Sequence, residues 1–304
     1  MTLFAATGSE IPSPARDERL RRAIARLTSL HDGEAGLVDV VALGPVAIPA
    51  LTEVLFSREP SGLFQARCRA VEALAALKAF SVLGEFLRRG HDKQDPVERL
   101  GEDAVVSTAA RAIARLCEPW VYELLLDLAR RRPLSGVLVG LGSFLRDESL
   151  AVFIDALQED DLRLTAEAIL RSFGTKARSA LTAAALEREE DPAGESDSHL
   201  RKRRSALALL GEIGVPRREW RRLRCLIDDD DHQVALLACE IGLKVGTATD
   251  RVQIASRLHA LRPTVVWIHR ERIDMLMNSL AAQSGRASSS AVVARDQPPH
   301  DSKS

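Results

Sequence analysis

The sequence is poor in aromatic residues and lacks the long β-branched runs of sheet proteins. Phe, Trp and Tyr make up 4% of the 304 residues, whereas hydrophobic residues make up 46% and are mostly Ala, Leu, Val and Ile. Sandwiches and barrels need β-branched and aromatic runs. The composition therefore favours closely packed helices. The net charge of −1 gives the chain no overall attraction to nucleic acid or to an anionic membrane.

The sequence contains no CxxC motif. The four cysteines lie singly in apolar helical contexts, so we expect reduced thiols in a cytoplasmic protein. Arg67 and Arg69 flank Cys68, so Cys68 is a candidate nucleophile if its thiol is exposed. The simpler interpretation is that Cys68 is a buried packing residue. The cysteines are Cys68, Cys117, Cys225 and Cys239.

Targeting and membrane segments are also missing from the pattern. The N-terminal sequence MTLFAATGSEIPSPARDE has no basic region followed by an apolar run, so we expect no signal peptide. The longest apolar stretch, from Leu134 to Leu145, falls short of the roughly 20 residues that cross a bilayer. We therefore expect a cytoplasmic protein with no membrane contact.

Catalytic and metal-binding signatures are absent as well. The sequence has no HExxH, no P-loop and no GxSxG nucleophile elbow. Gly140 and Gly142 begin a glycine pattern that is not completed, which indicates close helix packing. His199 and His232 lie near acidic residues but have no second ligand at metal-binding spacing. We expect no catalytic residue, no cofactor and no metal.

What the sequence does contain is an internal repeat. Six segments carry small or apolar residues at offsets 3, 6, 7 and 10 from a starting residue, which traces one face of an α-helix. Between these stripes lie shorter helical patterns, with Gly or Pro at the junctions. This arrangement predicts stacked helical pairs. The starting residues are Arg67, Val106, Leu134, Arg163, Arg203 and His232.

The segments that carry this pattern resemble the HEAT-repeat family, including the HEAT-like repeats of phycobilisome lyase relatives. They are LGPVAIPALTEVL at 43–55, QEDDLRLTAEAILRSFG at 158–174 and DDDDHQVALLACEIG at 228–242. The family pattern includes a Gly and a Pro in the first helix, as Gly44 and Pro49 provide. The resemblance covers roughly residues 37–247. It implies an all-α, armadillo-type α-solenoid, a right-handed superhelix of about seven helical pairs.

The domain organisation follows from the repeat. We expect a disordered N-terminus at 1–13, a solenoid at 14–283 and a disordered tail at 284–304. Within the solenoid, 14–36 is an N-terminal cap and 248–283 a divergent C-terminal cap, whose last helix is predicted from Pro263. Two polar inserts, 91–103 and 189–199, are expected to be loops available for recognition.

Charge is concentrated in one region. Residues 187–197 carry a net charge of −5, residues 200–224 carry +7, and four aspartates follow at 228–231. This pattern indicates either a site for an acidic partner or a solvated face neutralised by the acidic segments around it. The candidate partner-binding residues are Arg201, Lys202, Arg203, Arg204, Arg217, Arg218, Arg221, Arg222 and Arg224.

Three functions are compatible with these features. The first is a non-catalytic protein–protein interaction scaffold or adaptor with an extended concave surface for a protein partner. The second is an enzyme or enzyme accessory on the same fold, similar to a bilin lyase or a DNA glycosylase. The third is a regulatory subunit that docks an acidic partner through its arginines. The sequence favours the scaffold, which is not an enzyme, and it disfavours nucleic acid as the partner.

Overall fold

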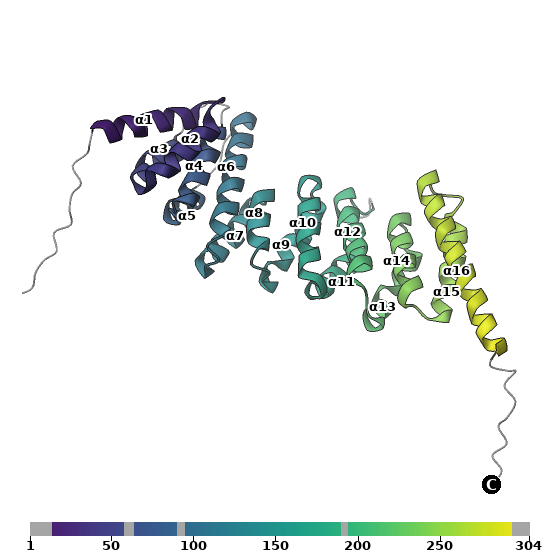
Figure 1. Ribbon diagram of the computed structural model, residues 1–304. Helices are drawn as coiled ribbons and strands as arrows, with labels where there is room; N and C mark the ends of the chain where they lie inside the picture. The colour runs from purple at the N-terminus through teal and green to yellow at the C-terminus, as the bar shows by residue number, and fades with distance from the viewer. Residues whose placement is uncertain (1–13, 58–63, 90–94, 190–193, 294–304) are drawn as a thin grey trace, which may run out of the picture. The chain divides into compact units, whose positions relative to one another are not determined.

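Every regular element in the described part of the chain is a helix. The computed structural model describes residues 14–57, 64–89, 95–189 and 194–293, with the backbone alone for 283–293. The chain forms two compact units, residues 1–149 and 150–304, and each has its own core. Figure 1 labels the helices of both units.

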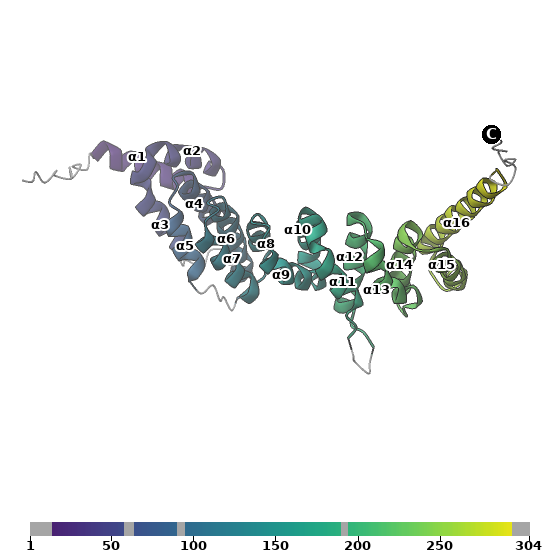
Figure 2. The same ribbon diagram turned by 90° about the horizontal axis from the view of Figure 1, so that it is seen from below.

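Unit 1 contains two layers of helices that alternate along the chain (Figure 2). Helices α2, α4, α6 and α8 pack on one another in succession, and α1 covers α2. The other layer holds α3, α5 and α7, where the rings of Phe56 and Phe86 meet at 5.7 Å. The bounds are α1 Pro14–Thr28, α2 Gly33–Leu43, α3 Ile48–Phe56, α4 Gln65–Ala76, α5 Phe80–Arg88, α6 Pro96–Ala114, α7 Pro119–Arg131 and α8 Ser135–Gly142.

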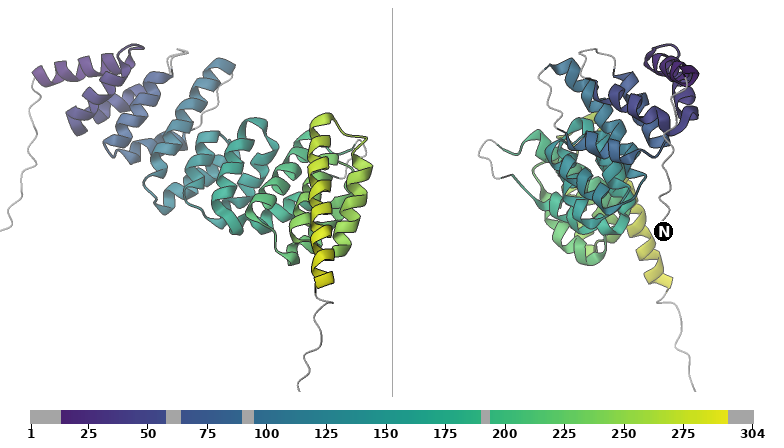
Figure 3. Two further views of the ribbon diagram at one scale, coloured as in Figure 1. Left: turned by 45° about the vertical axis from the view of Figure 1, so that its right-hand side comes forward. Right: turned by 90° about the vertical axis from the view of Figure 1, so that its left-hand side faces the viewer.

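Unit 2 repeats this arrangement. Helices α10, α12, α14 and α16 form one layer, and α9, α11, α13 and α15 form the other, with the short 3-10 helix η5 (Arg224–Asp228) extending α13. Figure 3 shows α16 running beside α15. The bounds are α9 Leu150–Asp155, α10 Asp160–Phe173, α11 Arg178–Leu186, α12 Asp197–Ile213, α13 Arg217–Leu223, α14 His232–Val245, α15 Ala248–Leu261 and α16 Trp267–Val293.

The predicted all-α fold of HEAT-like helical pairs is confirmed. The residues at offsets 3, 6 and 7 are buried in all six predicted stripes, which lie on α4, α6, α8, α10, α12 and α14. Eleven residues after five of the six starting positions, the backbone takes a positive φ that ends the helix. These five residues are Lys78, Cys117, Leu145, Gly174 and Gly214. The repeat therefore fixes the helix ends as well as the core face.

Lys78 occupies one of these left-handed positions without being glycine, with φ at 59°. Its side chain is exposed. Glycine adopts positive φ at no steric cost, whereas other residues pay about 1–2 kcal/mol. We expect Lys78→Gly to raise the free energy of unfolding by about 1 kcal/mol, once the greater freedom of glycine in the unfolded chain is subtracted. Chemical denaturation tests this. Lys78→Ala is the control and brings no gain, because alanine keeps the strained φ.

One segment differs from the expectation of no membrane-length apolar stretch. Gly33–Phe56 has a mean hydropathy of 1.8 over its best window, which suffices by length and composition to cross a bilayer. Its backbone, however, breaks at Gly44, where φ is 73°, and continues through a short 3-10 turn with Pro45. The two halves are α2 and α3, which pack separately against α1 and α4. The segment is therefore two separate helices of unit 1, with 22% of its most apolar window buried.

The ends and inserts differ in detail from the predicted boundaries. Helix α16 begins at Trp267 rather than at Pro263 and continues through Val293, ten residues into the predicted tail. Most of the insert at 91–103 is the start of α6, because Asp95 caps the backbone N–H groups of Val97 and Glu98. Ser196 likewise caps α12 inside the second insert. Residues 1–13, 294–304, 91–94 and 190–193 lie outside the described residues.

Candidate functional site

Helix α13 is held in place by its apolar face. Trp220 and Leu223 are buried, and Ile227 in η5 continues this buried face, as their spacing along the sequence predicts. The indole Nε1 of Trp220 donates a hydrogen bond to Asp250 Oδ2 at 3.1 Å. Asp250 also accepts from the backbone N–H and the hydroxyl of Thr247 at the start of α15. This contact ties α13 to α15.

The opposite face of α13 is covered with arginines. Arg217, Arg218, Arg221 and Arg222 are exposed, and their guanidinium groups form no ion pair with any described residue. Arg224 is different, because its Nε lies 2.9 Å from Asp250 Oδ1. We call the four exposed residues the arginine stripe. They place unneutralised positive charge on one short helix.

The pairing of Arg224 shows which edge of α13 faces α15. Residues three, four and seven apart lie along one side of a helix. Arg221 and Arg217 precede Arg224 by three and seven residues, so they share its edge. Part of the arginine stripe therefore borders the space between α13 and α15.

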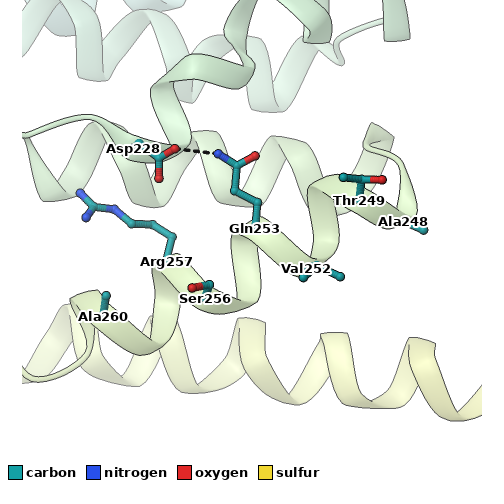
Figure 4. A pocket seen from close by; sticks show the side chains of 8 residues that line it. All are labelled: Asp228, Ala248, Thr249, Val252, Gln253, Ser256, Arg257 and Ala260. Atoms are coloured by element: carbon teal, nitrogen blue, oxygen red, sulfur yellow. Dashed lines mark hydrogen bonds between the residues drawn. The ribbon is translucent and has the colours of Figure 1, made fainter.

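A groove of about 750 Å³ runs along the outer face of α15, and Asp228 of η5 borders it (Figure 4). Asp228 forms one wall, where it accepts a hydrogen bond from Gln253 Nε2 at 2.6 Å. Arg257 donates to the backbone oxygen of Asp229 at 2.6 Å. The side chain of Val252 is 72% exposed along the groove. From the sequence we expect 248–283 to be only a cap. The signal in the sequence for this groove is the four-residue spacing of Ala248, Val252, Ser256 and Ala260, which places these residues on one face of α15.

The basic residues of α12 are each paired with a carboxylate, so they do not form one exposed patch with the arginines of α13. Arg203 is fully buried, and its guanidinium lies 2.6 Å from Glu195 and 2.5 Å from Asp229. Its Nε donates to the backbone oxygen of Ala185 at 3.1 Å. Arg67 in unit 1 occupies the matching repeat position and makes the equivalent bonds to Leu55 and Glu102. Arg203 is therefore a structural residue of the repeat.

The other three basic residues of α12 are also neutralised. Arg201 lies 2.9 Å from Asp160, and Lys202 lies 2.9 Å from Glu187. Arg204 reaches both oxygens of Asp231 at 2.5 and 3.0 Å. The hydrogen bond from Lys202 lowers the pKa of Glu187. The acidic segments and Asp160 thus neutralise the basic residues of α12 but not the arginine stripe of α13, and the two helices lie in different layers.

Asp250 joins α13 to α15 through its contacts with Trp220 and Arg224. Burial alone raises the pKa of Asp250, but the hydrogen bonds from Thr247 and Trp220, with the charge of Arg224, outweigh it and lower that pKa. The carboxylate therefore stays ionised at neutral pH. It holds the edge of α13 that carries Arg221 against the start of α15.

The histidines have structural partners. His199 Nδ1 lies 2.6 Å from Glu195. The ring of His232 on α14 lies 5.3 Å from that of His269 on α16. Burial lowers the pKa of His269, and the nearby His232 and Arg272 lower it further. Within the described residues, no group of three or more His, Cys, Asp or Glu is arranged to hold a metal ion.

The cysteines separate into two buried or half-buried thiols and two exposed ones. Burial raises the pKa of Cys68, the candidate nucleophile, in spite of its neighbouring arginines. Burial also raises the pKa of Cys239 to about 12. Cys117 and Cys225 are exposed. Cys225 lies at the end of α13, next to the arginine stripe.

Gly140 and Trp120 are closely packed, whereas Trp267 is exposed. A Cβ on Gly140 would lie 2.8 Å from the backbone oxygen of Ala110, which confirms close packing of α8 on α6. Trp120 packs against Gly84 and under Arg88 in unit 1. Trp267, however, is 68% exposed, and Val266, predicted to face inward, is 61% exposed. These two residues lie at the start of α16, the last helix of its layer.

Comparison with known proteins gives similarity of fold only. No protein-family profile and no curated protein matches the sequence. Among solved structures, the HEAT-like repeats protein from Thermococcus onnurineus NA1 is 13% identical with a TM-score of 0.37, over 90% of this chain and 99% of that one. The complex of CpcE and CpcF of phycocyanin lyase from Nostoc sp. PCC7120 is 19% identical with a TM-score of 0.33, over 92% and 98%. Human deoxyhypusine hydroxylase is 14% identical with a TM-score of 0.33, over 88% and 98%.

Proposed function

We propose that this chain is a non-catalytic, cytoplasmic binding protein that holds an acidic protein partner through the arginine stripe of α13. The observation that carries the proposal is the contrast between α12 and α13. The basic residues of α12 each have a carboxylate partner, whereas Arg217, Arg218, Arg221 and Arg222 have none among the described residues. Four adjacent guanidinium groups attract carboxylates, and each guanidinium can bind one carboxylate through two parallel hydrogen bonds.

A protein partner suits this surface better than nucleic acid does. Nucleic-acid sites extend positive charge over a long surface. Here the arginine stripe occupies one short helix, and acidic groups lie close to it. The side chain of Asp230 is 94% exposed, and Asp228 forms the groove wall. Such local charge complements a short acidic segment and repels a continuous phosphate backbone.

The state of the thiols supports a role without covalent catalysis. A nucleophilic cysteine acts as its thiolate and needs a lowered pKa. Burial instead raises the pKa of Cys68 and of Cys239. We therefore place the function in the binding surface. The repeat alone would place the partner on a concave surface. The exposed arginines instead favour the layer of α11, α13 and α15 as the surface that binds the partner.

Charge reversal tests the proposal. We expect Arg217→Glu/Arg221→Glu/Arg222→Glu to weaken binding of a fluorescent Asp- and Glu-rich peptide by about 10- to 100-fold, because exposed charges mainly set attraction and association rate. Fluorescence anisotropy at low and high salt measures the effect. The matched control is Arg99→Glu/Arg115→Glu/Arg130→Glu, which reverses three exposed arginines of unit 1.

The fold should survive in both triple variants, since none of the six side chains is buried. Far-UV circular dichroism checks this. Equal affinity of the two variants for the peptide would contradict the proposal. Preferential binding of a single-stranded oligonucleotide that also needs the arginine stripe would replace a protein partner by nucleic acid.

A further inference from the structure

We propose that a pocket at the C-terminal end of α12 binds a small aliphatic carboxylate. The pocket has a volume of about 380 Å³ and lies within unit 2. It is lined by residues of α11, α12 and α14 and by the connection from α12 to α13. No residue of the arginine stripe lines it, so this ligand is separate from the acidic protein partner.

Two cationic side chains that line the pocket reach the last turn of α12 from the helices on either side of it. Arg178, the first residue of α11, donates from Nε to the backbone oxygen of Gly214 at 2.9 Å. Lys244, in the last turn of α14, donates from Nζ to the backbone oxygen of Gly211 at 3.2 Å. Because the two carbonyls are three residues apart at one helix end, the two cations lie close together.

Both cations keep donors for a ligand. Their hydrogen bonds use only Nε of Arg178 and one N–H of Lys244, and the two Nη atoms of Arg178 bond to no described residue. Glu219 Oε2 lies 3.7 Å from Arg178 Nε, and Lys244 has no carboxylate partner among the described residues. The site therefore carries a net positive charge. A guanidinium and an ammonium side by side can bind one carboxylate through charge-assisted hydrogen bonds.

The rest of the pocket is apolar. Leu210, Val215 and Ile241 are core residues that show an edge to it, and Val245 is half-buried beside them. A site for an inorganic anion needs no such surface. Covering these apolar edges favours a ligand with an aliphatic body next to its carboxylate. A volume of about 380 Å³ is at the small end of ligand pockets, so the ligand is small.

Gly211 leaves space in the pocket that packing does not require. It lies inside α12, and a Cβ there would approach nothing closer than Ile241 at 3.8 Å. At Gly242, by contrast, a Cβ would lie 2.7 Å from Trp220 and from Ile254, so close packing does require glycine. Glycine weakens a helix relative to alanine. The open pocket accounts for the glycine at position 211.

A ligand-detected NMR titration of the full chain tests the inference. The probe is 4-methylpentanoate, and the comparison ligands are acetate and 4-methylpentanamide. We expect the probe to bind about tenfold more tightly than the amide, which has the same aliphatic body but no charge. We also expect it to bind about tenfold more tightly than acetate, which has the charge but buries little apolar surface.

Three variants assign the binding to this pocket. Lys244→Met should weaken binding of the probe by about tenfold and leave binding of the amide unchanged. The matched control, Lys176→Met, should change neither, because Lys176 is an exposed lysine of unit 2 that does not line the pocket. Gly211→Leu should abolish binding, since the new side chain occupies the pocket. Far-UV circular dichroism checks that each variant folds.

Several results would overturn the inference. They are the absence of binding by the probe, equal affinity for the probe and the amide, equal affinity for the probe and acetate, and equal effects of Lys244→Met and Lys176→Met. Unchanged binding in a folded Gly211→Leu would place the ligand elsewhere and overturn it as well. If Gly211→Leu does not fold, the two lysine variants decide the matter.

Discussion

Replacing Arg203 by methionine should lower the free energy of unfolding of unit 2 by about 3–5 kcal/mol. The Arg203 side chain is fully buried and bonds to Glu195, Asp229 and the backbone oxygen of Ala185. Methionine fills similar space but leaves two carboxylates without their cation. A buried charge that loses its partner costs far more than the pair contributes. Urea denaturation followed by circular dichroism measures the change.

Arg262→Met provides the control for this prediction. Arg262 lies 2.7 Å from Asp274, but its side chain is 50% exposed and that of Asp274 is 43% exposed. Exposed ion pairs contribute less than about 1 kcal/mol. Equal effects of the two substitutions would show that the network around Arg203 does not hold α11, α12 and η5 together. A loss confined to Arg203→Met supports its assignment as a structural residue.

Replacing Gly136 by alanine should destabilise unit 1 by about 2–3 kcal/mol. A Cβ at this position would lie 2.4 Å from Ser107 Cβ and 2.5 Å from the backbone oxygen of Ser107. These distances are too short for real contacts, so α8 has to move away from α6. That movement also opens the contact between Gly140 and Ala110 one turn later. Thermal or chemical denaturation measures the loss.

The same substitution at Gly211 should have the opposite sign. Gly211 lies inside α12, and a Cβ there would approach nothing closer than Ile241 at 3.8 Å. Alanine favours a helix over glycine by about 1 kcal/mol. Gly211→Ala should therefore stabilise unit 2. If both substitutions change the stability in the same direction, the close approach of α6 and α8 is not the reason that glycine occupies position 136.

The repeat was predictable from the sequence because its determinants are local. Offsets of 3, 6 and 7 residues lie within two turns of one helix, so the buried face follows from the residues of that helix alone. The free arginines were not predictable in the same way. Arg201 is neutralised by Asp160 at the start of α10, whereas Arg203 and Arg204 are neutralised by Asp229 and Asp231 in the turn before α14. Counting charge along the chain could not tell α12 from α13.

The last helix shows a second limit of sequence reasoning. An apolar pattern on α16 predicted inward residues, and Ile273 and Leu280 are buried as expected. Val266 and Trp267 are exposed, because within the described residues no further helix follows α16 in its layer. Hydrophobic periodicity identifies a face but does not state whether another element covers it. The α15 groove was missed for the same reason.

The rate of alkylation of Cys225 tests the central claim most directly. Cys225 is exposed beside the arginine stripe, and Cys117 is exposed in unit 1 as an internal control, while Cys239 is buried with a pKa of about 12. Iodoacetamide labelling at each thiol can be followed by mass spectrometry with and without the Asp- and Glu-rich peptide. A bound segment on α13 should slow labelling of Cys225 several-fold and leave Cys117 unchanged. Equal labelling of Cys225 at saturating peptide would contradict docking at the arginine stripe.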